Sequence, residues 1–275
     1  MKNKIPVRFF IITFLWSWLL YGILIFIGHV NSQNIEFTPF GGLDFFLMLL
    51  GAFGPAVGAI ISIYTIDGIE SLKKYFKSFL SLKFGWKVWL SIFFIFGISS
   101  MFAWLIPEFF GEERILTYLP SIFLFPVWII ITTLIGGGQE EFGWRGYIMP
   151  FLEKEFGLIF GGLFLGIIWA IWHIPLWFVP GSTQIYVNFI GFTLGAIGAS
   201  YIYSWIIKKS NNRLLSGLFV HGIANAFTAL FPVSPISFNE RLTRFWIYKI
   251  LILVIGIIIV IIRTIKTENT SHNKR

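Results

Sequence analysis

The sequence contains no cysteine, which excludes disulfide bonds, a thiol nucleophile and a cysteine metal site. Charge is also scarce, because only 12% of the 275 residues are Asp, Glu, Lys or Arg, whereas soluble domains carry about 25%. Hydrophobic residues make up 56% of the chain, and the mean hydropathy is +0.80. A chain of this size cannot hide so much apolar surface from water. We therefore expect an integral membrane protein whose main surroundings are the lipid bilayer.

Long apolar runs follow one another with short gaps. A membrane-spanning helix needs about 20 apolar residues, and eight segments approach that length: roughly residues 9–28, 42–65, 86–106, 118–137, 157–179, 185–207, 214–231 and 245–262. The pattern predicts an all-α fold, a polytopic transmembrane helical bundle with about eight spanning helices. We divide this membrane domain into residues 1–115 with the first three helices, a central part 116–235, and residues 236–275 with the last helix and a tail.

The net charge of +8 does not indicate nucleic acid, because most basic residues lie in every second connection between apolar segments. These clusters are Lys2, Lys4 and Arg8; Lys73, Lys74, Lys77, Lys83 and Lys87; Arg145 and Lys154; Lys208, Lys209 and Arg213; and Arg263, Lys266, Lys274 and Arg275. Cytoplasmic loops of membrane proteins are enriched in Lys and Arg. The alternation predicts a multi-pass protein of the cell membrane with both termini in the cytoplasm, and Lys249 is expected to reach the surface from a span end.

Ionisable side chains inside apolar segments are costly in a bilayer, so they indicate function. The first group is the run Gly-Gly-Gly-Gln-Glu-Glu-Phe-Gly-Trp-Arg-Gly at residues 136–146. The second is Trp169 with His173, and the third is His221 with Asn225. Residues four apart share a helix face, so each group can aim its polar atoms in one direction, towards the bundle interior.

Simpler interpretations apply to each group by itself. Glu141 and Arg145 are equally well explained as an ion pair that closes a loop, and a single membrane histidine often only hydrogen-bonds across helices. Glu140, however, is left over once Glu141 pairs with Arg145. One carboxylate, two imidazoles and one amide are together the groups that activate water and stabilise an oxyanion.

The ordered motifs Glu-Glu-x-x-x-Arg, aromatic-x-x-x-His and His-x-x-x-Asn resemble the CAAX prenyl protease and Abi family (CPBP, the type II CAAX endopeptidases) of intramembrane proteases. The resemblance extends over roughly residues 118–231, which makes 116–235 the expected catalytic core. The second motif departs from the family pattern, since Trp169 stands where the family usually has Phe. We expect this exchange to alter the pocket shape more than the chemistry.

The resemblance implies a peptidase without a covalent intermediate, acting on a membrane-associated, CAAX-like or bacteriocin-like peptide or protein. Glu140 would be the general base and His173 would help it to polarise water, while His221 and Asn225 would stabilise the oxyanion. Glu141 and Arg145 would be structural and would fix the helix that presents Glu140. The cofactor stays open between none and a divalent metal such as zinc, with Glu140, His173 and His221 as its ligands.

Other intramembrane proteases match less well. The sequence has no His-Glu-x-x-His and no Gly-x-Ser-x-Gly motif, and its only aspartates are Asp44 and Asp67. Two alternatives to a protease stay open: an ion-coupled transporter with a polar path through the bundle, and a catalytically silent immunity or scaffold protein.

One geometric conflict follows from the predicted helices. If the fourth helix ended at Pro150, Glu140 would lie about 15 Å from that end. His173 would lie about 24 Å from a fifth helix beginning at Gly157. The two side chains would then differ in depth by about 9 Å, unless the helices tilt or begin below the membrane surface.

Overall fold

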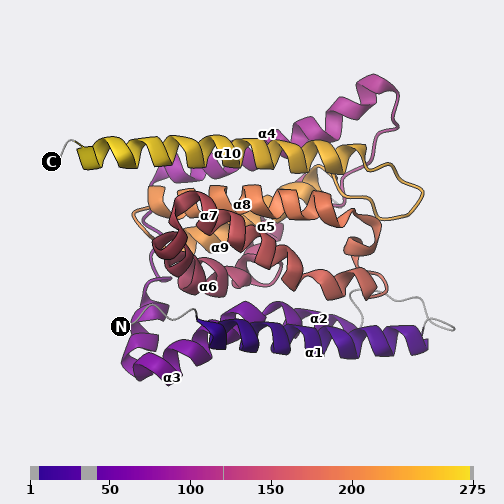
Figure 1. Ribbon diagram of the computed structural model, residues 1–275. Coiled ribbons are helices and arrows are strands. Elements are labelled where there is room, and N and C mark those ends of the chain that lie inside the picture. Colours follow the sequence, from indigo (N-terminus) through magenta and orange to yellow (C-terminus); the bar gives the residue numbers. More distant parts are fainter. Residues whose placement is uncertain (1–5, 32–41, 120, 273–275) are drawn as a thin grey trace.

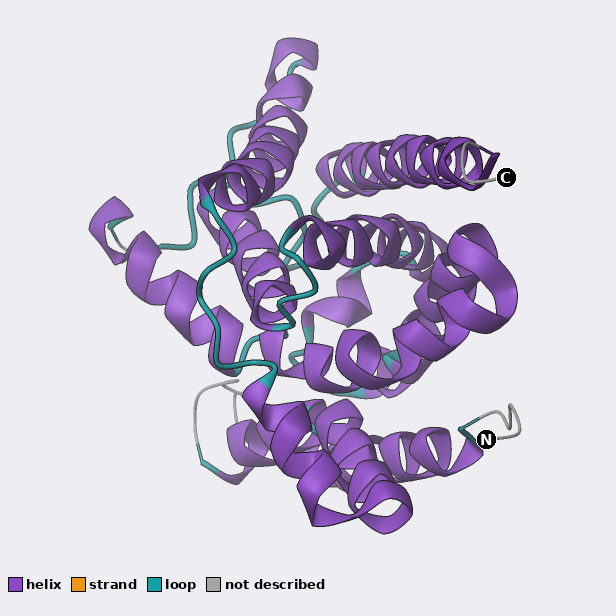
Figure 2. Ribbon diagram, turned by 90° about the vertical axis from the view of Figure 1, so that its left-hand side faces the viewer, coloured by secondary structure: helices purple, strands orange, loops and turns teal. Residues whose placement is uncertain are grey.

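The computed structural model describes residues 6–31, 42–119 and 121–272. Within these ranges the chain forms helices joined by loops, without strands, which confirms the predicted all-α class. Figure 1 shows α1 to α3 along one side of the bundle, α10 along the opposite side and α5 to α9 between them. Figure 2 shows the same bundle after a quarter turn, with the helices enclosing a central region.

The first side of the bundle is formed by α1 (Val7–Asn31), α2 (Leu43–Ala52) and α3 (Gly54–Lys77). Helix α1 packs against both α2 and α3, which meet at a bend of 48°. Pro55 stands in the first turn of α3, where its missing N–H leaves no intrahelical hydrogen bond unmade. The bend at residue 53 therefore turns one apolar segment into two helices.

The opposite side contains α4 (Trp86–Leu105) and α10 (Thr243–His272), and α8 (Phe189–Lys209) and α9 (Leu215–Leu230) lie between the two sides. Helix α8 lies between α7 (Met149–Trp172) and α10 and is buried along most of its length. Such a helix is apolar around its circumference because protein rather than lipid surrounds it. It forms one wall of the cavity described below.

The stretch from 122 to 178 differs most from the expected straight helices. Helix α5 (Phe125–Leu134) ends early and is followed by a 3₁₀ turn (Gly138–Glu140), the short α6 (Glu141–Gly143), a π-helical turn (Trp144–Ile148) and α7. Helix α7 breaks at Gly157, whose φ of 75° and ψ of 177° are not helical. Leu152 and Gly161 are nine residues apart, so in a straight helix they would lie about 13 Å from each other. Their backbones instead meet, because a Cβ placed on Gly161 would lie 2.9 Å from the carbonyl carbon of Leu152. The chain therefore reverses direction at Gly157.

This geometry corrects the expected end of the fourth helix. Pro150 does not end a helix but lies in the first turn of α7, and the helix continues to the break at Gly157. A proline is tolerated in a first turn because its missing N–H would be unpaired there anyway. The predicted difference in depth between Glu140 and His173 rested on straight helices ending at Pro150, so that argument no longer applies.

The described residues contain five helices that are long and apolar enough to cross a membrane, or up to six if the bent pair α2 and α3 is one span. The expected count of eight is not confirmed. Two expected spans, 118–137 and 157–179, fall within the single apolar stretch Ile122–Phe178. A third coincides with α9, whose 16 residues fall short of the about 20 that a bilayer requires.

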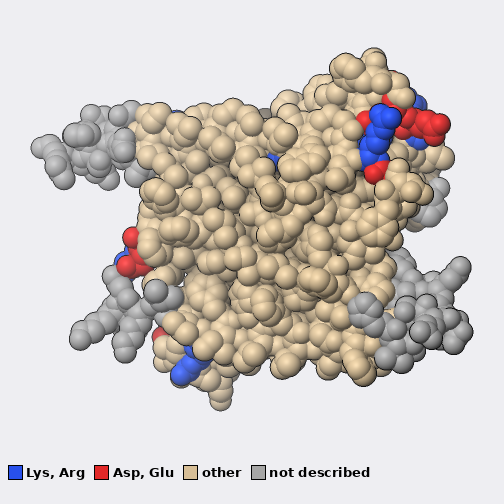
Figure 3. Space-filling model, turned by 45° about the vertical axis from the view of Figure 1, so that its right-hand side comes forward, with Lys and Arg blue, Asp and Glu red and all other residues tan. Residues whose placement is uncertain are grey.

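Charged side chains gather at the two ends of the bundle, and the surface between them is almost uncharged (Figure 3). Large apolar side chains are exposed in this band, for example Leu19 at 64% and Phe26 at 72%. The start of α1 and the end of α10 lie at the same end of the bundle (Figure 1). The apolar band and the long apolar helices are those of an integral membrane protein.

Candidate active site

The glycine run after α5 brings the acidic motif against α9. Gly137 has a φ of +118°, which only glycine adopts readily. A Cβ at this position would lie 2.5 Å from His221 Nε2 and 2.6 Å from Asn225 Nδ2. The backbone thus passes directly over the polar side chains of α9, and any larger residue would push them away.

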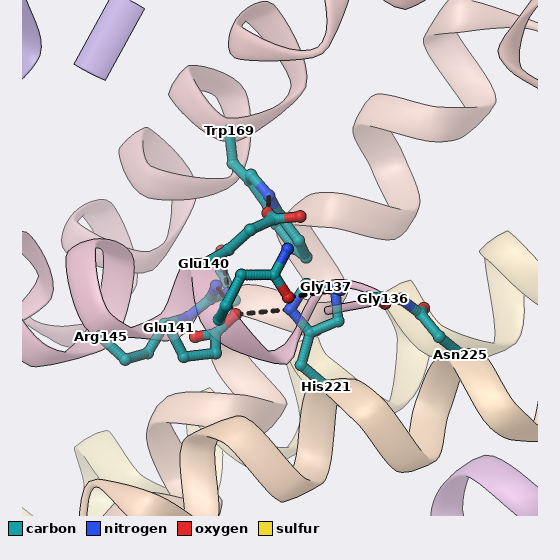
Figure 4. A network of polar contacts seen from close by, with 10 residues as sticks. Gly136, Gly137, Glu140, Glu141, Arg145, Trp169, His221 and Asn225 are labelled. Carbon is teal, nitrogen blue, oxygen red and sulfur yellow. Dashed lines mark hydrogen bonds and ion pairs between the residues drawn. The ribbon is translucent and has the colours of Figure 1, made fainter. Parts of the chain in front are cut away.

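Glu141 is fully enclosed and holds two partners. Arg145 Nη1 lies 2.9 Å from Glu141 Oε1, the contact that the four-residue spacing predicts. His221 Nδ1 lies 2.8 Å from the same oxygen, although sequence spacing gave no reason to expect this contact. Figure 4 shows Glu141 pointing towards both partners and away from Glu140. One carboxylate therefore connects the acidic motif with α9.

The Arg145 guanidinium is enclosed by aromatic rings. Its Cζ lies 4.7 Å from the ring centroid of Trp169 and 4.8 Å from that of Tyr203. Its Nη2 also donates to Ser200 Oγ at 3.2 Å. A buried guanidinium suits such a place because its planar fork can stack on rings and donate in the plane at the same time. These contacts join the acidic motif to α7 and α8.

Glu140 points to a different neighbour. Trp169 Nε1–H donates to Glu140 Oε2 at 2.7 Å, and Figure 4 shows this side chain lying beside the indole. The presence of Trp169 in place of the family's usual Phe was expected to alter the pocket shape more than the chemistry, and that expectation stays a prediction. Phenylalanine has no N–H, whereas the indole donates a charge-assisted hydrogen bond to the carboxylate.

The two histidines have the same arrangement at Nδ1. His173 lies at the end of α7, and its Nδ1 is 2.8 Å from the Trp169 carbonyl oxygen. Carbonyl and carboxylate oxygens only accept, so Nδ1–H donates in both His173 and His221. In its neutral form each ring then carries its lone pair on Nε2. Asn225 Nδ2 donates to the Gly136 carbonyl at 2.7 Å and keeps a second N–H.

The four side chains predicted to be catalytic, Glu140, His173, His221 and Asn225, all line one cavity of about 450 Å³. Its remaining lining is mainly aromatic and aliphatic. Helices α1, α2, α4, α7, α8, α9 and α10 all contribute residues. The structure thus brings together residues that are up to 85 positions apart in sequence.

Three further lining residues were not assigned from sequence. Gln139 is buried, and its Oε1 accepts the Gly137 N–H at 2.9 Å, which fixes the glycine turn. Trp169 was noted for its spacing to His173 but not as a donor. Lys249 was expected to reach the surface, yet it lines the cavity. The signal available in the sequence was its position as a lone charge in the apolar run of the last helix.

The metal expectation can be tested on the donor set. Among the described residues, no group of three or more His, Cys, Asp or Glu side chains is placed to hold a metal ion. Glu140, His173 and His221 in this geometry do not fit a zinc site.

Comparison with known proteins supplies the family. Residues 122–227 match the model of the family described as type II CAAX prenyl endopeptidase Rce1-like. The chain is also 24% identical over 240 residues to CAAX prenyl protease 2 of Methanococcus maripaludis, covering 83% of this chain and 86% of that relative. The chain is therefore similar to the CAAX prenyl endopeptidases. All the motif residues that line the cavity fall inside the matched segment, whereas Lys249 lies beyond it.

Proposed function

We propose that this protein, like the CAAX prenyl endopeptidases it resembles, is an intramembrane endopeptidase that cleaves a membrane-associated peptide with a water molecule activated by Glu140 and His173. The observation that supports it most is the shared cavity, in which a carboxylate, two imidazoles and an amide face the same space. These groups can perform general-base catalysis and oxyanion stabilisation without a nucleophilic side chain.

In the proposed reaction Glu140 takes a proton from water while His173 Nε2 accepts from the same molecule and orients it. The Trp169 N–H holds the Glu140 carboxylate in place. The oxygen of water attacks the carbonyl carbon of the peptide, and the carbonyl oxygen becomes an oxyanion. The proton held by Glu140 then passes to the leaving amine as the C–N bond breaks, which returns the carboxylate to its starting state.

The oxyanion needs N–H donors, and α9 offers two. Asn225 has a second N–H beyond the one bound to Gly136. His221 supplies a donor from Nε2 only as an imidazolium, which Glu141 stabilises through Nδ1–H. In that form Glu140, Glu141, Arg145 and His221 carry no net charge together.

The side of the membrane to which the cavity opens indicates where its substrate is found. Its lining includes Phe45 in the first turn of α2, Gln184 just before α8 and Ser234 after α9. Helix α8 begins at the end of the bundle opposite to the start of α1 and the end of α10 (Figure 1). We assign the basic end of the bundle to the cytoplasm of the cell membrane by the positive-inside rule. The outermost terminal residues lie outside the described part of the chain. The cavity then faces the exterior, which favours an exported, bacteriocin-like peptide over a cytoplasmic CAAX protein.

A topology experiment tests this orientation. A reporter active only outside the cytoplasm is fused in the loop holding Glu112 and Arg114, and a second one after the C-terminus. We expect signal from the loop fusion and none from the C-terminal fusion. The opposite result would reverse the assigned orientation and with it the preference for an exported substrate.

The catalytic proposal is tested by comparing membrane peptides of cells that express wild type, Glu140→Gln or Glu70→Gln. Glu70 is an exposed carboxylate in a surface pair, so its variant is a matched control for the chemical change. We expect peptides cleaved by wild type and Glu70→Gln to persist uncut with Glu140→Gln. A chelator added to the purified protein should leave cleavage unchanged.

The same variants separate the alternatives. In a transporter, Glu140→Gln would abolish proton or cation flux into proteoliposomes and no peptide would be cut by any variant. In a silent scaffold neither flux nor peptide pattern would respond. Peptide processing that depends on Glu140 is expected only from the protease.

A further inference from the structure

Lys249 places a positive charge inside the same cavity. It lies six residues after the first residue of α10, about 9 Å along the helix axis. Its helix is otherwise apolar at this level, and a lysine within a membrane helix marks a functional site unless its charge is satisfied. The catalytic steps proposed above make no use of it.

The fold makes room for this side chain. A Cβ on Gly195 of α8 would lie 2.4 Å from Lys249 Cδ. The aliphatic part of the lysine side chain therefore crosses α8 at Gly195, because glycine has no side chain there. Gly195 also lines the cavity. The ammonium Nζ lies 5.4 Å from each of the ring centroids of Phe192, Phe245 and Tyr248. These rings hold the lysine in a fixed place and attract its charge through their faces.

Aromatic rings do not neutralise a cation. In the described part of the chain, no carboxylate lies within ion-pair distance of Lys249. The nearby acidic groups have other partners, since Glu141 binds Arg145 and His221 and Glu140 binds Trp169. The second buried cation at this end of the bundle, Arg244, is paired with Glu112 at 3.1 Å. Lys249 is therefore a cation presented to whatever enters the cavity.

We propose that Lys249 binds the free C-terminal carboxylate of the peptide substrate. The inference rests on the proposed endopeptidase function and adds a specificity determinant to it. An extended chain spans about 3.3 Å per residue, so a terminus held by Lys249 sets how far from the chain end Glu140 and His173 can act. Such an anchor selects peptides that end near the cleaved bond and rejects internal segments of longer chains.

A phosphate of a lipid headgroup is the other anion available in a membrane. The peptide carboxylate is favoured because Lys249 shares its cavity with the four catalytic side chains. A lipid bound there would occupy the space that a substrate needs. The two sources are separated by the experiment below.

The test uses one random peptide library synthesised twice, with C-terminal carboxylates and with C-terminal carboxamides, and read by mass spectrometry. Full-length wild type, Lys249→Met and Lys249→Arg are compared, with Lys209→Met as the matched control. Lys209 also lies over an aromatic ring, Trp205, but is exposed at the far end of α8.

We expect wild type and Lys209→Met to cleave the carboxylate library at least about tenfold better than the carboxamide library, which corresponds to 1.4 kcal/mol. Lys249→Met should lose this preference and Lys249→Arg should retain much of it. A preference that survives in Lys249→Met, or one absent from wild type, overturns the proposal.

A binding arm keeps the inference separate from catalysis. The same libraries are added to Glu140→Gln and to Glu140→Gln/Lys249→Met, and thermal unfolding is measured. We expect stabilisation of the single variant by the carboxylate library only, and none of the double variant. If no protein cleaves but this pattern appears, the proposed function fails and the anchor stands. If phosphatidylglycerol gives the Lys249-dependent stabilisation and peptides give none, the carboxylate assignment is overturned.

Discussion

Two adjacent carboxylates illustrate two regions of this molecule. Glu141 lies in the packed interior, with an arginine and a histidine on one oxygen and no exposed surface. Glu140, one residue earlier, faces the cavity and receives one indole N–H. The enclosed side chain can only hold the fold together, whereas the side chain that faces the cavity can meet a substrate. The backbone between α5 and α7 produces this division by turning irregularly rather than as a straight helix.

The largest effect should come from breaking the enclosed pair. Arg145→Ala leaves Glu141 as a buried charge with only His221 beside it and removes two ring contacts. Loss of one partner from a buried ion pair costs roughly 3–5 kcal/mol. We expect poor expression and a clearly lowered melting temperature in detergent. Wild-type melting of this variant would show that Glu141 is not held as described.

The next test exchanges each carboxylate for its amide. Glu141→Gln should cost roughly 2 kcal/mol of stability, because charge-assisted hydrogen bonds become neutral ones while an acceptor remains. Glu140→Gln should melt like wild type, yet peptide cleavage should fall by at least about 10²-fold through loss of the general base. Equal melting of both variants would remove the distinction between the two regions.

Trp169→Phe sharpens the comparison on the cavity side. It introduces the residue usual in the family, removes the N–H bound to Glu140 and leaves a smaller ring beside Arg145. We expect a folded protein whose kcat falls about tenfold, corresponding to about 1.4 kcal/mol, because the carboxylate is less well oriented. Single-turnover cleavage measures it, and an unchanged kcat would mean that Glu140 is positioned by other contacts.

The smallest effect is expected at an ion pair on the surface. Arg114 lies 2.7 Å from Glu108, a shorter distance than in the Arg145–Glu141 pair, but the arginine side chain is 59% exposed. Water and salt screen such pairs, and many contribute nothing measurable. Arg114→Ala should leave both melting and cleavage unchanged. A loss resembling that of Arg145→Ala would show that burial is not what separates the pairs.

Several features of the site were visible in the sequence because they depend on local spacing. Residues four positions apart predicted that Glu141 meets Arg145, and that contact is present. The placement of ionisable residues in apolar runs predicted that Glu140, His173, His221 and Asn225 share a site, and they line one cavity. Their individual catalytic roles remain predictions for the variants above.

Other features depend on contacts between distant segments. The Trp169–Glu140 hydrogen bond joins residues 29 apart and the His221–Glu141 contact residues 80 apart. Neither follows from helix periodicity, since the segment around Glu140 is not a regular helix. The placement of Lys249, on α10, in the cavity depends on the gap that Gly195 leaves in α8, two helices earlier in the chain.

The sequence alone indicated a lipid environment, the helical class and the family resemblance, because lipid selects long apolar helices and the motifs lie at fixed spacings. Tertiary structure alone decided which carboxylate is enclosed and which faces the cavity, and that the chain reverses at Gly157 within one apolar stretch. The physical reason is that apolar periodicity reports only that a segment is buried in lipid or protein. Which polar atoms meet inside the bundle is decided by how helices from distant parts of the chain pack.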